Sequence, residues 1–213
     1  MTKSVRLIFL VIVSSLAAHG VAGADAKPAT ILFYGDSLTA GYGLDDPTET
    51  AFPALIADRI EAAGLPYRVI NAGLSGETSS GGLRRINWVL RQPVDVFVLE
   101  LGANDGLRGL PLDLLRTNLQ QIIDRVRAKN PDVRLVIAGM QMPTSMGEYA
   151  PDFAAIYPDI AAANDAALIP FLLEGVGGVT NLNQSDGIHP TPAGHEILAA
   201  TVWQTLQPLL ATP

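Results

Sequence analysis

Residues 30–38 read Thr-Ile-Leu-Phe-Tyr-Gly-Asp-Ser-Leu, and this stretch decides the fold. A short run of branched and aromatic apolar residues, closed by a glycine, is typical of a strand buried inside a parallel sheet. Asp36 and Ser37 follow the run at once, so both belong at the carboxyl end of that strand. Ligand sites of open parallel sheets form beyond the carboxyl ends of the strands. The stretch therefore predicts both the kind of sheet and the edge that carries the site.

Further runs of the same kind alternate along the chain with amphipathic stretches. Strands are predicted at residues 30–34, 67–71, 94–101, 133–138 and 167–170. Helices, with apolar residues spaced at about 3.6, are predicted at residues 51–63, 81–91, 111–128, 149–164 and 192–209. Such alternation implies a three-layer α/β/α sandwich around a mainly parallel five-stranded sheet.

The first residues have the pattern of a secretory signal rather than of a domain. Lys3 and Arg6 precede an apolar run at residues 7–18, which ends in small residues. The run is shorter than the roughly 20 residues that a membrane-spanning helix needs, which disfavours an uncleaved anchor. We expect residues 1–24 to be a signal peptide, with cleavage within a few residues of Ala24 and export to the periplasm or the medium.

The remaining residues, 25–213, suffice for a single domain with a sizeable core. The chain has no cysteine, which excludes disulfides, thiol catalysis and thiolate metal sites. Its formal net charge is −7, and loss of Lys3 and Arg6 with the leader would lower that charge by two. A charge of this sign repels nucleic acid. We expect a monomer or weak oligomer without a stable membrane anchor.

Glycines and polar residues also follow the second and third predicted strands. Residues 72–78 read Ala-Gly-Leu-Ser-Gly-Glu-Thr, and residues 102–106 read Gly-Ala-Asn-Asp-Gly. Because parallel strands end at one edge, both segments are expected beside Ser37. Asn104 is either a turn former, as Asn-Asp-Gly commonly is, or a side-chain donor to a developing oxyanion. The Gly76 N–H is a candidate for a further donor.

Outside the leader the chain has two histidines, and a serine hydrolase that works at neutral pH needs one of them as its general base. His189 lies in the segment Asp-Gly-Ile-His-Pro at residues 186–190, where the proline favours extended geometry for the histidine. The Asp186 carboxylate can accept a bond from its imidazole and fix the tautomer. The alternative for this segment is a turn with an incidental histidine. His195 is predicted inside the last helix, facing solvent or packed against the sheet.

Ser37 itself admits two interpretations. A serine at a strand-to-helix turn is commonly a helix cap. Gly35 permits a tight turn and close approach of a substrate. The Ser37 N–H would then point from a helix N-terminus toward any negative charge that develops. These features favour Ser37 as a nucleophile.

Four segments in this order resemble the sequence blocks of the GDSL or SGNH hydrolase superfamily, which is named for its Ser, Gly, Asn and His. The resemblance covers nearly all of the chain outside the leader, and its blocks are residues 35–41, 75–78, 102–106 and 186–190. Within the superfamily, three more segments resemble the group of multifunctional acyl-CoA thioesterase I, lysophospholipase L1 and arylesterase, namely residues 107–111, 156–158 and 171–175.

The resemblance implies a flavodoxin-like fold and a hydrolase that needs no cofactor or metal. The roles that it implies are a catalytic triad, Ser37, Asp186 and His189, and an oxyanion hole, Ser37, Gly76 and Asn104. Some relatives carry Asp where this chain has Glu77, and a second Gly where it has Ala103. Neither difference touches the proposed chemistry.

The implied reaction is hydrolysis of a small-molecule carboxylic ester or thioester, including lysophospholipid, through an acyl-Ser37 intermediate. Apolar residues after the third predicted strand would bind the acyl group, namely Leu107, Leu110 and Pro111. Met140, Met142 and Met146 would extend this surface unless they fill the core. Two alternatives stay open: a carbohydrate acetyl esterase, which the few aromatic residues disfavour, and a catalytically inactive binding protein of the same fold.

Overall fold

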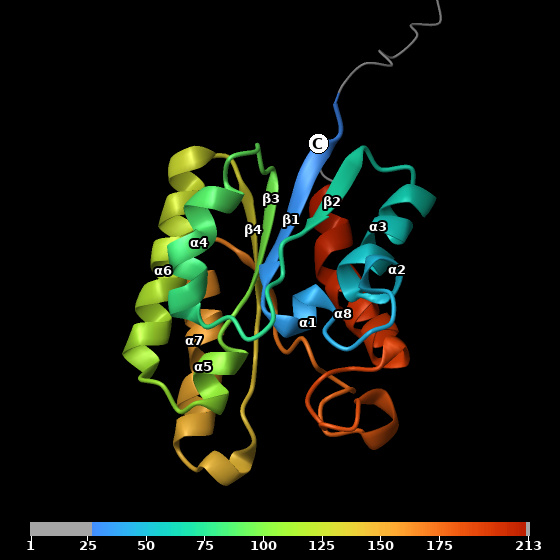
Figure 1. Cartoon of the computed structure of the whole chain (residues 1–213). Helices are drawn as coiled ribbons and strands as arrows, with labels where there is room; N and C mark the ends of the chain where they lie inside the picture. The colour runs from blue at the N-terminus through green and yellow to red at the C-terminus, as the bar shows by residue number, and fades with distance from the viewer. Residues whose placement is uncertain (1–26, 212–213) are drawn as a thin grey trace, which may run out of the picture.

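The computed structural model describes residues 27–211 of the 213-residue chain. At its centre lies a five-stranded sheet in the order β2-β1-β3-β4-β5, with every pair of neighbours parallel (Figure 1). This is the flavodoxin-like order, so the expected sheet is confirmed. The strands are β1 (Ala29–Gly35), β2 (Tyr67–Asn71), β3 (Val96–Glu100), β4 (Arg134–Ala138) and β5 (Ala167–Ile169).

Helices cover both faces of the sheet and complete a three-layer sandwich (Figure 1). On one face lie α3 (Phe52–Ala62) and α8 (Pro192–Leu210), which pack against each other. The other face is covered by α4 (Ser79–Val89), α6 (Leu112–Lys129) and α7 (Tyr149–Ala163). Shorter helices lie in the connections: α1 (Ser37–Ala40), α2 (Pro47–Thr50), α5 (Ala103–Leu107) and the 3-10 turns Thr144–Met146 and Thr180–Leu182.

The central strands are apolar along their length because helices cover both of their faces. Every residue of β3 is buried, as is β1 after its first residue. Phe33 points to one layer, where its ring meets Phe52 of α3 edge to face with centroids 5.5 Å apart. Tyr34 points to the other layer, where its hydroxyl donates to the carbonyl oxygen of Gly82 in α4 at 2.6 Å. Strand β1 is thus held from both sides up to the point where the chain turns into Ser37.

All the strands and helices predicted from periodicity are present, and their ends differ from the predicted ones by at most two residues. The helices α2 and α5 were not predicted, and only the start of α1, at the strand-to-helix turn of Ser37, was expected. All three are only four or five residues long, and capping side chains rather than an apolar repeat define α1 and α2. Asp36 caps α1 by accepting from Leu38 N, and Asp46 caps α2 by accepting from Thr48 N.

His195 does not face solvent, which was one of its two expected environments. It is fully buried in α8 and contacts Phe52 of α3. Its ring stacks on that of Phe52 with centroids 6.2 Å apart, and its Nδ1 accepts a hydrogen bond from Phe52 N at 3.2 Å. No side chain at the N-cap position, Ala51, satisfies the first turn of α3. His195 therefore caps α3 from a neighbouring helix, which a reading of local sequence cannot reveal.

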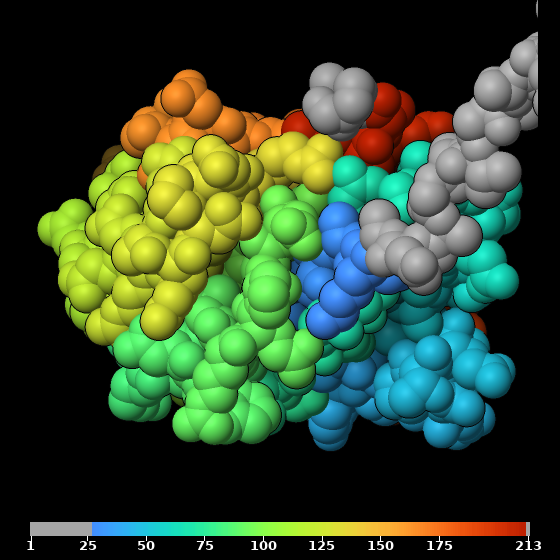
Figure 2. All heavy atoms as spheres, turned by 90° about the horizontal axis from the view of Figure 1, so that it is seen from above, coloured from blue at the N-terminus to red at the C-terminus, as the bar shows by residue number. Residues whose placement is uncertain are grey.

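The two ends of the sheet differ in what they carry. Short helices and long loops gather at the carboxyl ends of the strands, at the bottom of Figure 1. The opposite end is seen in Figure 2, where the start of β1, in blue, lies between the two helical layers. No described helix is long and apolar enough to cross a membrane. The predicted signal peptide, residues 1–24, lies outside the described residues.

Candidate active site

Ser37, His189 and Asp186 form a hydrogen-bonded series at the carboxyl edge of the sheet. His189 Nε2 lies 3.0 Å from Ser37 Oγ, and His189 Nδ1 lies 2.6 Å from Asp186 Oδ2. A carboxylate can only accept, so Nδ1 carries the proton and Nε2 is left to accept from the serine hydroxyl. The series can therefore draw the proton from Ser37.

The loop that carries Asp186 and His189 is fixed by its own backbone. Asp186 Oδ1 accepts from Ile188 N at 2.9 Å and from His189 N at 3.1 Å. Gly187, between them, has a φ of 72°, a conformation that favours glycine. The bond from the His189 ring and these two N–H groups lower the pKa of Asp186 to about 2. The carboxylate thus stays ionised beside the imidazole at any working pH.

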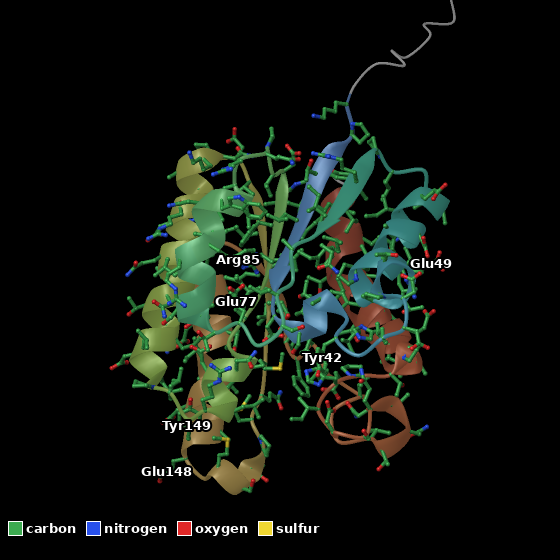
Figure 3. The ribbon with its side chains drawn as sticks, viewed as in Figure 1. Tyr42, Glu49, Glu77, Arg85, Glu148 and Tyr149 are labelled. Atoms are coloured by element: carbon green, nitrogen blue, oxygen red, sulfur yellow. The ribbon has the colours of Figure 1, made fainter. Side chains whose placement is uncertain are left out.

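Tyr42 also touches the imidazole, and the sequence analysis missed it. Its ring centroid lies 4.6 Å from that of His189, at an interplanar angle of 47°. Gln184 joins the two segments, because its side chain donates to the Tyr42 carbonyl oxygen at 2.8 Å while its N–H donates to the His189 carbonyl oxygen at 2.7 Å. Tyr42 is labelled in Figure 3, near the carboxyl ends of the strands. Its position directly after the short helix that begins at Ser37 was the one sequence feature that could have indicated a place near the site.

Three candidate hydrogen-bond donors come from three strand ends. Ser37 N–H belongs to the first turn of α1, where a backbone N–H has no acceptor within the helix. Asn104 stands in the first turn of α5, and Gly76, with a φ of 78°, lies in the loop after β2. Within residues 27–211, no protein group accepts from the Gly76 N–H. Arg108 donates to the Gly76 carbonyl oxygen at 3.2 Å, which links this loop to α5.

Buried polar side chains hold the loops of Gly76 and Asn104 together. Asp105 is fully buried, and its carboxylate accepts from Ser79 N at 2.8 Å and from Ser79 Oγ at 2.6 Å. Asn118 of α6 donates to the same serine hydroxyl at 2.9 Å. The start of α4 is thereby tied to α5 and α6.

A second tie lies on the other side of the Gly76 loop. Glu77 and Arg85 form an ion pair and point toward each other in Figure 3. The Arg85 guanidinium also donates to the Ala72 carbonyl oxygen at 2.8 Å and stacks over the Tyr34 ring, 4.2 Å from its centroid. The loop is thus anchored at both of its ends.

Two carboxyl groups are buried directly behind Ser37. Asp36 Oδ2 accepts from Asn104 Nδ2 at 3.1 Å, and its other oxygen accepts from Leu38 N. Glu100, at the end of β3, is 1% exposed. Burial raises the pKa of Asp36 to about 6, and burial together with the Asp36 charge raises the pKa of Glu100 well above its usual range. Glu100 was not predicted as part of the site, because it stands at the end of an apolar strand.

A cavity of about 580 Å³ opens at Ser37, Asn104 and His189. Of the three residues predicted to bind the acyl group, Leu107 lines this cavity, and Leu110 and Pro111 are not among the lining residues. Met140 and Met142 both line the cavity and pack into the core, so the two predicted positions do not exclude each other. Gly76 is also absent from the lining. Apolar residues make up most of the wall, among them Leu38, Leu107, Met140, Met142, Pro143, Phe171, Leu173 and Ile188.

The described residues contain no group of three or more His, Asp or Glu side chains placed to hold a metal ion.

A family model assigns the chain to a known group of proteins. Residues 33–197, from the end of β1 into α8, match the GDSL-like lipase/acylhydrolase family. The chain belongs to this family. The matched range includes Ser37, Gly76, Asn104, Asp186 and His189, so the residues that gather at the site edge all lie within it.

Relatives and solved structures agree with this membership. Esterase TesA of Pseudomonas aeruginosa is 43% identical over 187 residues, which cover 87% of this chain and 91% of the relative. An arylesterase of Vibrio mimicus is 35% identical over 95% of this chain and 98% of its own length. A crystal structure of TesA superposes with a TM-score of 0.80 at 42% identity, covering 84% of this chain and 99% of that one. The expected SGNH hydrolase fold is thereby confirmed.

Proposed function

We propose that this protein is a serine esterase that hydrolyses carboxylic esters or thioesters of acyl substrates through an acyl-Ser37 intermediate. The observation that carries the proposal is the hydrogen-bonded series from Asp186 through His189 to Ser37 at the mouth of an apolar cavity. Nucleophile, base and orienting acid stand within hydrogen-bond distance in that order, which is what acyl transfer by serine requires.

In the first half of the reaction His189 Nε2 takes the Ser37 proton while Ser37 Oγ attacks the substrate carbonyl carbon. The negative charge that forms on the carbonyl oxygen is held by Ser37 N–H, Gly76 N–H and the Asn104 side-chain amide. The tetrahedral intermediate collapses, and protonated His189 gives its proton to the departing alcohol or thiol. Asp186 holds the imidazole in the tautomer that makes this exchange possible.

In the second half a water molecule takes the place of the leaving group. His189 removes a proton from that water, the resulting hydroxide adds to the acyl-Ser37 carbonyl, and the same three donors hold the oxyanion. Collapse of this intermediate breaks the acyl–Oγ bond and returns the proton to Ser37. The products are the free acid and the unchanged enzyme.

The cavity supports an acyl chain longer than acetyl as the group that is transferred. Its wall next to Ser37 is built from Leu107, Met140, Met142 and Phe171, which offer apolar surface and few donors. Relatives are named esterase and arylesterase, and the solved esterase EstA from Pseudoalteromonas sp., 32% identical with a TM-score of 0.78, was inhibited by monoethylphosphonate. Export of the chain would separate it from cytosolic acyl-CoA, which favours esters and lysophospholipids over thioesters.

The test compares purified wild type with Ser37→Ala on p-nitrophenyl esters of increasing chain length. We expect wild type to be labelled by a fluorophosphonate, and Ser37→Ala to lose both label and turnover. Ser145→Ala, at an exposed serine, is the matched control and should keep both. Full activity of Ser37→Ala would overturn the proposal, and a preference for acetate alone would favour a carbohydrate acetyl esterase.

We propose in addition that the chain is exported, with residues 1–24 removed. The support is the basic and apolar pattern of those residues. Mass spectrometry of the protein recovered outside the cytoplasm should give an N-terminus close to Asp25. Recovery of the full-length chain from the cytoplasm would contradict this proposal.

A further inference from the structure

Asp36 and Glu100 form a buried pair at the point where β1 and β3 end. Gly35 of β1 and Glu100 of β3 are register partners, so the glutamate side chain lies against the turn that presents Ser37. Both carboxyl groups are essentially inaccessible to solvent, with exposed fractions of 0% for Asp36 and 1% for Glu100. The proposed reaction does not use Glu100, and an ionisable group buried this deeply calls for a physical reason.

Gly35 leaves the space that Glu100 occupies. A Cβ at position 35 would lie 2.1 Å from Thr39 Oγ1 and 2.4 Å from Glu100 Oε2, closer than real atoms approach. Only glycine fits there, because the Glu100 carboxyl and the Thr39 hydroxyl fill the volume of any side chain. The glycine before Asp36 and Ser37 is thus explained by the contact with Glu100 and not only by the turn.

The hydrogen bonds of the two carboxyl groups are unequal. Asp36 accepts from Leu38 N at 3.0 Å and from Asn104 Nδ2 at 3.1 Å, so each of its oxygens has a donor. Glu100 Oε2 accepts from Asp36 N at 3.2 Å and from Thr39 Oγ1 at 2.7 Å. Glu100 Oε1 is buried without a hydrogen-bond partner. The donors thus favour charge on both oxygens of Asp36 but on only one oxygen of Glu100.

The charged and titratable groups around the pair do not neutralise it. No lysine or arginine in residues 27–211 forms an ion pair with either carboxyl group. Arg85 donates instead to the Gly35 carbonyl oxygen at 3.4 Å. The phenol of Tyr157 on α7 donates to the Leu101 carbonyl oxygen at 3.2 Å. Asp105 on α5 adds negative charge nearby, and His189 acts on Asp36 from the solvent side.

Two neighbouring carboxylates without a cation, buried from water, cannot both be ionised. We propose that Glu100 is a positioning residue that carries a proton at neutral pH, so that the single charge of the pair rests on Asp36 and fixes the orientation of the Asn104 amide. The second half of this inference rests on the function proposed above.

The consequence for Asn104 is geometric. An amide NH₂ group has two hydrogens. The ionised Asp36 accepts a hydrogen bond from one of them, so the second can point at the substrate oxyanion. A charged acceptor also excludes the flipped amide, whose oxygen would face the carboxylate. Glu100 acts through Asp36 and need not touch the substrate.

The proton is read directly by ¹³C NMR of protein labelled at the glutamate side-chain carboxyl carbon. At pH 7 one resonance is expected at the position of a protonated acid while the others are those of carboxylates. That resonance should be missing in Glu100→Gln. Ionised shifts for every glutamate at pH 7 would overturn the proposal. The reading does not depend on turnover, so it stands apart from a failure of the esterase assignment.

Two variants test the positioning role. Glu100→Gln keeps an oxygen for Asp36 N and Thr39 and places a neutral donor where the protonated Oε1 stands, so kcat on a p-nitrophenyl ester should stay within about threefold of wild type. Glu100→Leu removes the acceptor and should lower kcat roughly tenfold to hundredfold with little change in KM, as misplaced catalytic groups do. Glu174→Gln, at an exposed glutamate, is the control and should change nothing. A loss in Glu100→Gln as large as that in Asn104→Ala would contradict a neutral Glu100, even if Glu100→Leu fails to fold.

Discussion

The two halves of the site are held in different ways. Asp186 and His189 stand on one loop and are fixed by bonds within three residues of each other, two of them to the backbone. The donors at Gly76 and Asn104 are instead placed by buried side chains from distant parts of the chain, such as Asp105 against Ser79. The half with Asp186 and His189, which we call the base half, can therefore be altered without disturbing the fold. The half with Gly76 and Asn104, which we call the donor half, cannot be altered without changing buried contacts of the core.

The largest effect is expected in the base half. Removal of the imidazole in His189→Ala should lower kcat by about a millionfold, because the serine then has no base. The free energy of unfolding should change far less than kcat, since the backbone N–H groups of Ile188 and His189 keep their bonds to Asp186 in the variant. Steady-state kinetics and chemical denaturation measure the two quantities. A fall in kcat below a hundredfold would mean that another group removes the Ser37 proton.

A smaller but still large effect is expected in the donor half. Asn104→Ala removes one hydrogen bond to the oxyanion and should lower kcat by roughly a hundredfold to a thousandfold. KM should change little, because the bond forms mainly in the transition state. Kinetics on one ester at several concentrations separate the two parameters. If Asn104→Ala raises KM and keeps kcat, Asn104 binds the substrate in the ground state and not the oxyanion of the transition state.

His195 extends the comparison, because it has a structural role although it lies only six residues after the proposed base, His189. Burial lowers the pKa of His195 to about 4, whereas in the unfolded chain it would titrate near 6.5. The unfolded state therefore binds the proton first as pH falls, and the folded state loses about 3 kcal/mol of stability between pH 6.5 and 4. His195→Asn keeps an acceptor for Phe52 N and has no charge to gain. Urea denaturation across this pH range should show a weaker pH dependence for the variant, with unchanged kcat at pH 7.

Asp105→Asn tests whether the donor half depends on the core. One of the two Ser79 donors loses its buried acceptor, which should reduce the free energy of unfolding by about 2 kcal/mol. Because the same bond joins the loops of Gly76 and Asn104, kcat should fall as well. Asp113→Asn, at an exposed position on α6, is the control. Lower stability with an unchanged kcat would show that the donors are held independently of this link.

The smallest effect is expected at Tyr42. Its ring restrains the His189 imidazole through packing, a contact that is worth about 1 kcal/mol. Tyr42→Ala should therefore lower kcat about fivefold, whereas Tyr42→Phe keeps the ring and should match wild type. If the phenylalanine variant loses as much as the alanine variant, the hydroxyl matters and the packing argument is wrong.

The same contrast explains what the sequence could predict. Strands and long helices follow from apolar periodicity, and the Asp186–His189 pair follows from a spacing of three residues around a glycine. Glu100, Asp105, Tyr42 and the capping role of His195 depend on residues that are far apart in sequence. Glu100 and Asn104 both act on Asp36 from more than 60 positions away. Such contacts can be inferred only once the strand order is known, so no local sequence pattern predicts them.

Helix α8 begins beside the His189 loop and runs back to the other end of the sheet, where β1 begins (Figure 1). The described chain thus enters and leaves the domain on the face turned away from the cavity. A tag, a surface linker or a fused partner attached at either end would leave the mouth of the cavity open to solution. Immobilisation through a terminus should therefore preserve turnover, whereas attachment through a side chain near Tyr42 or Leu107 should obstruct it.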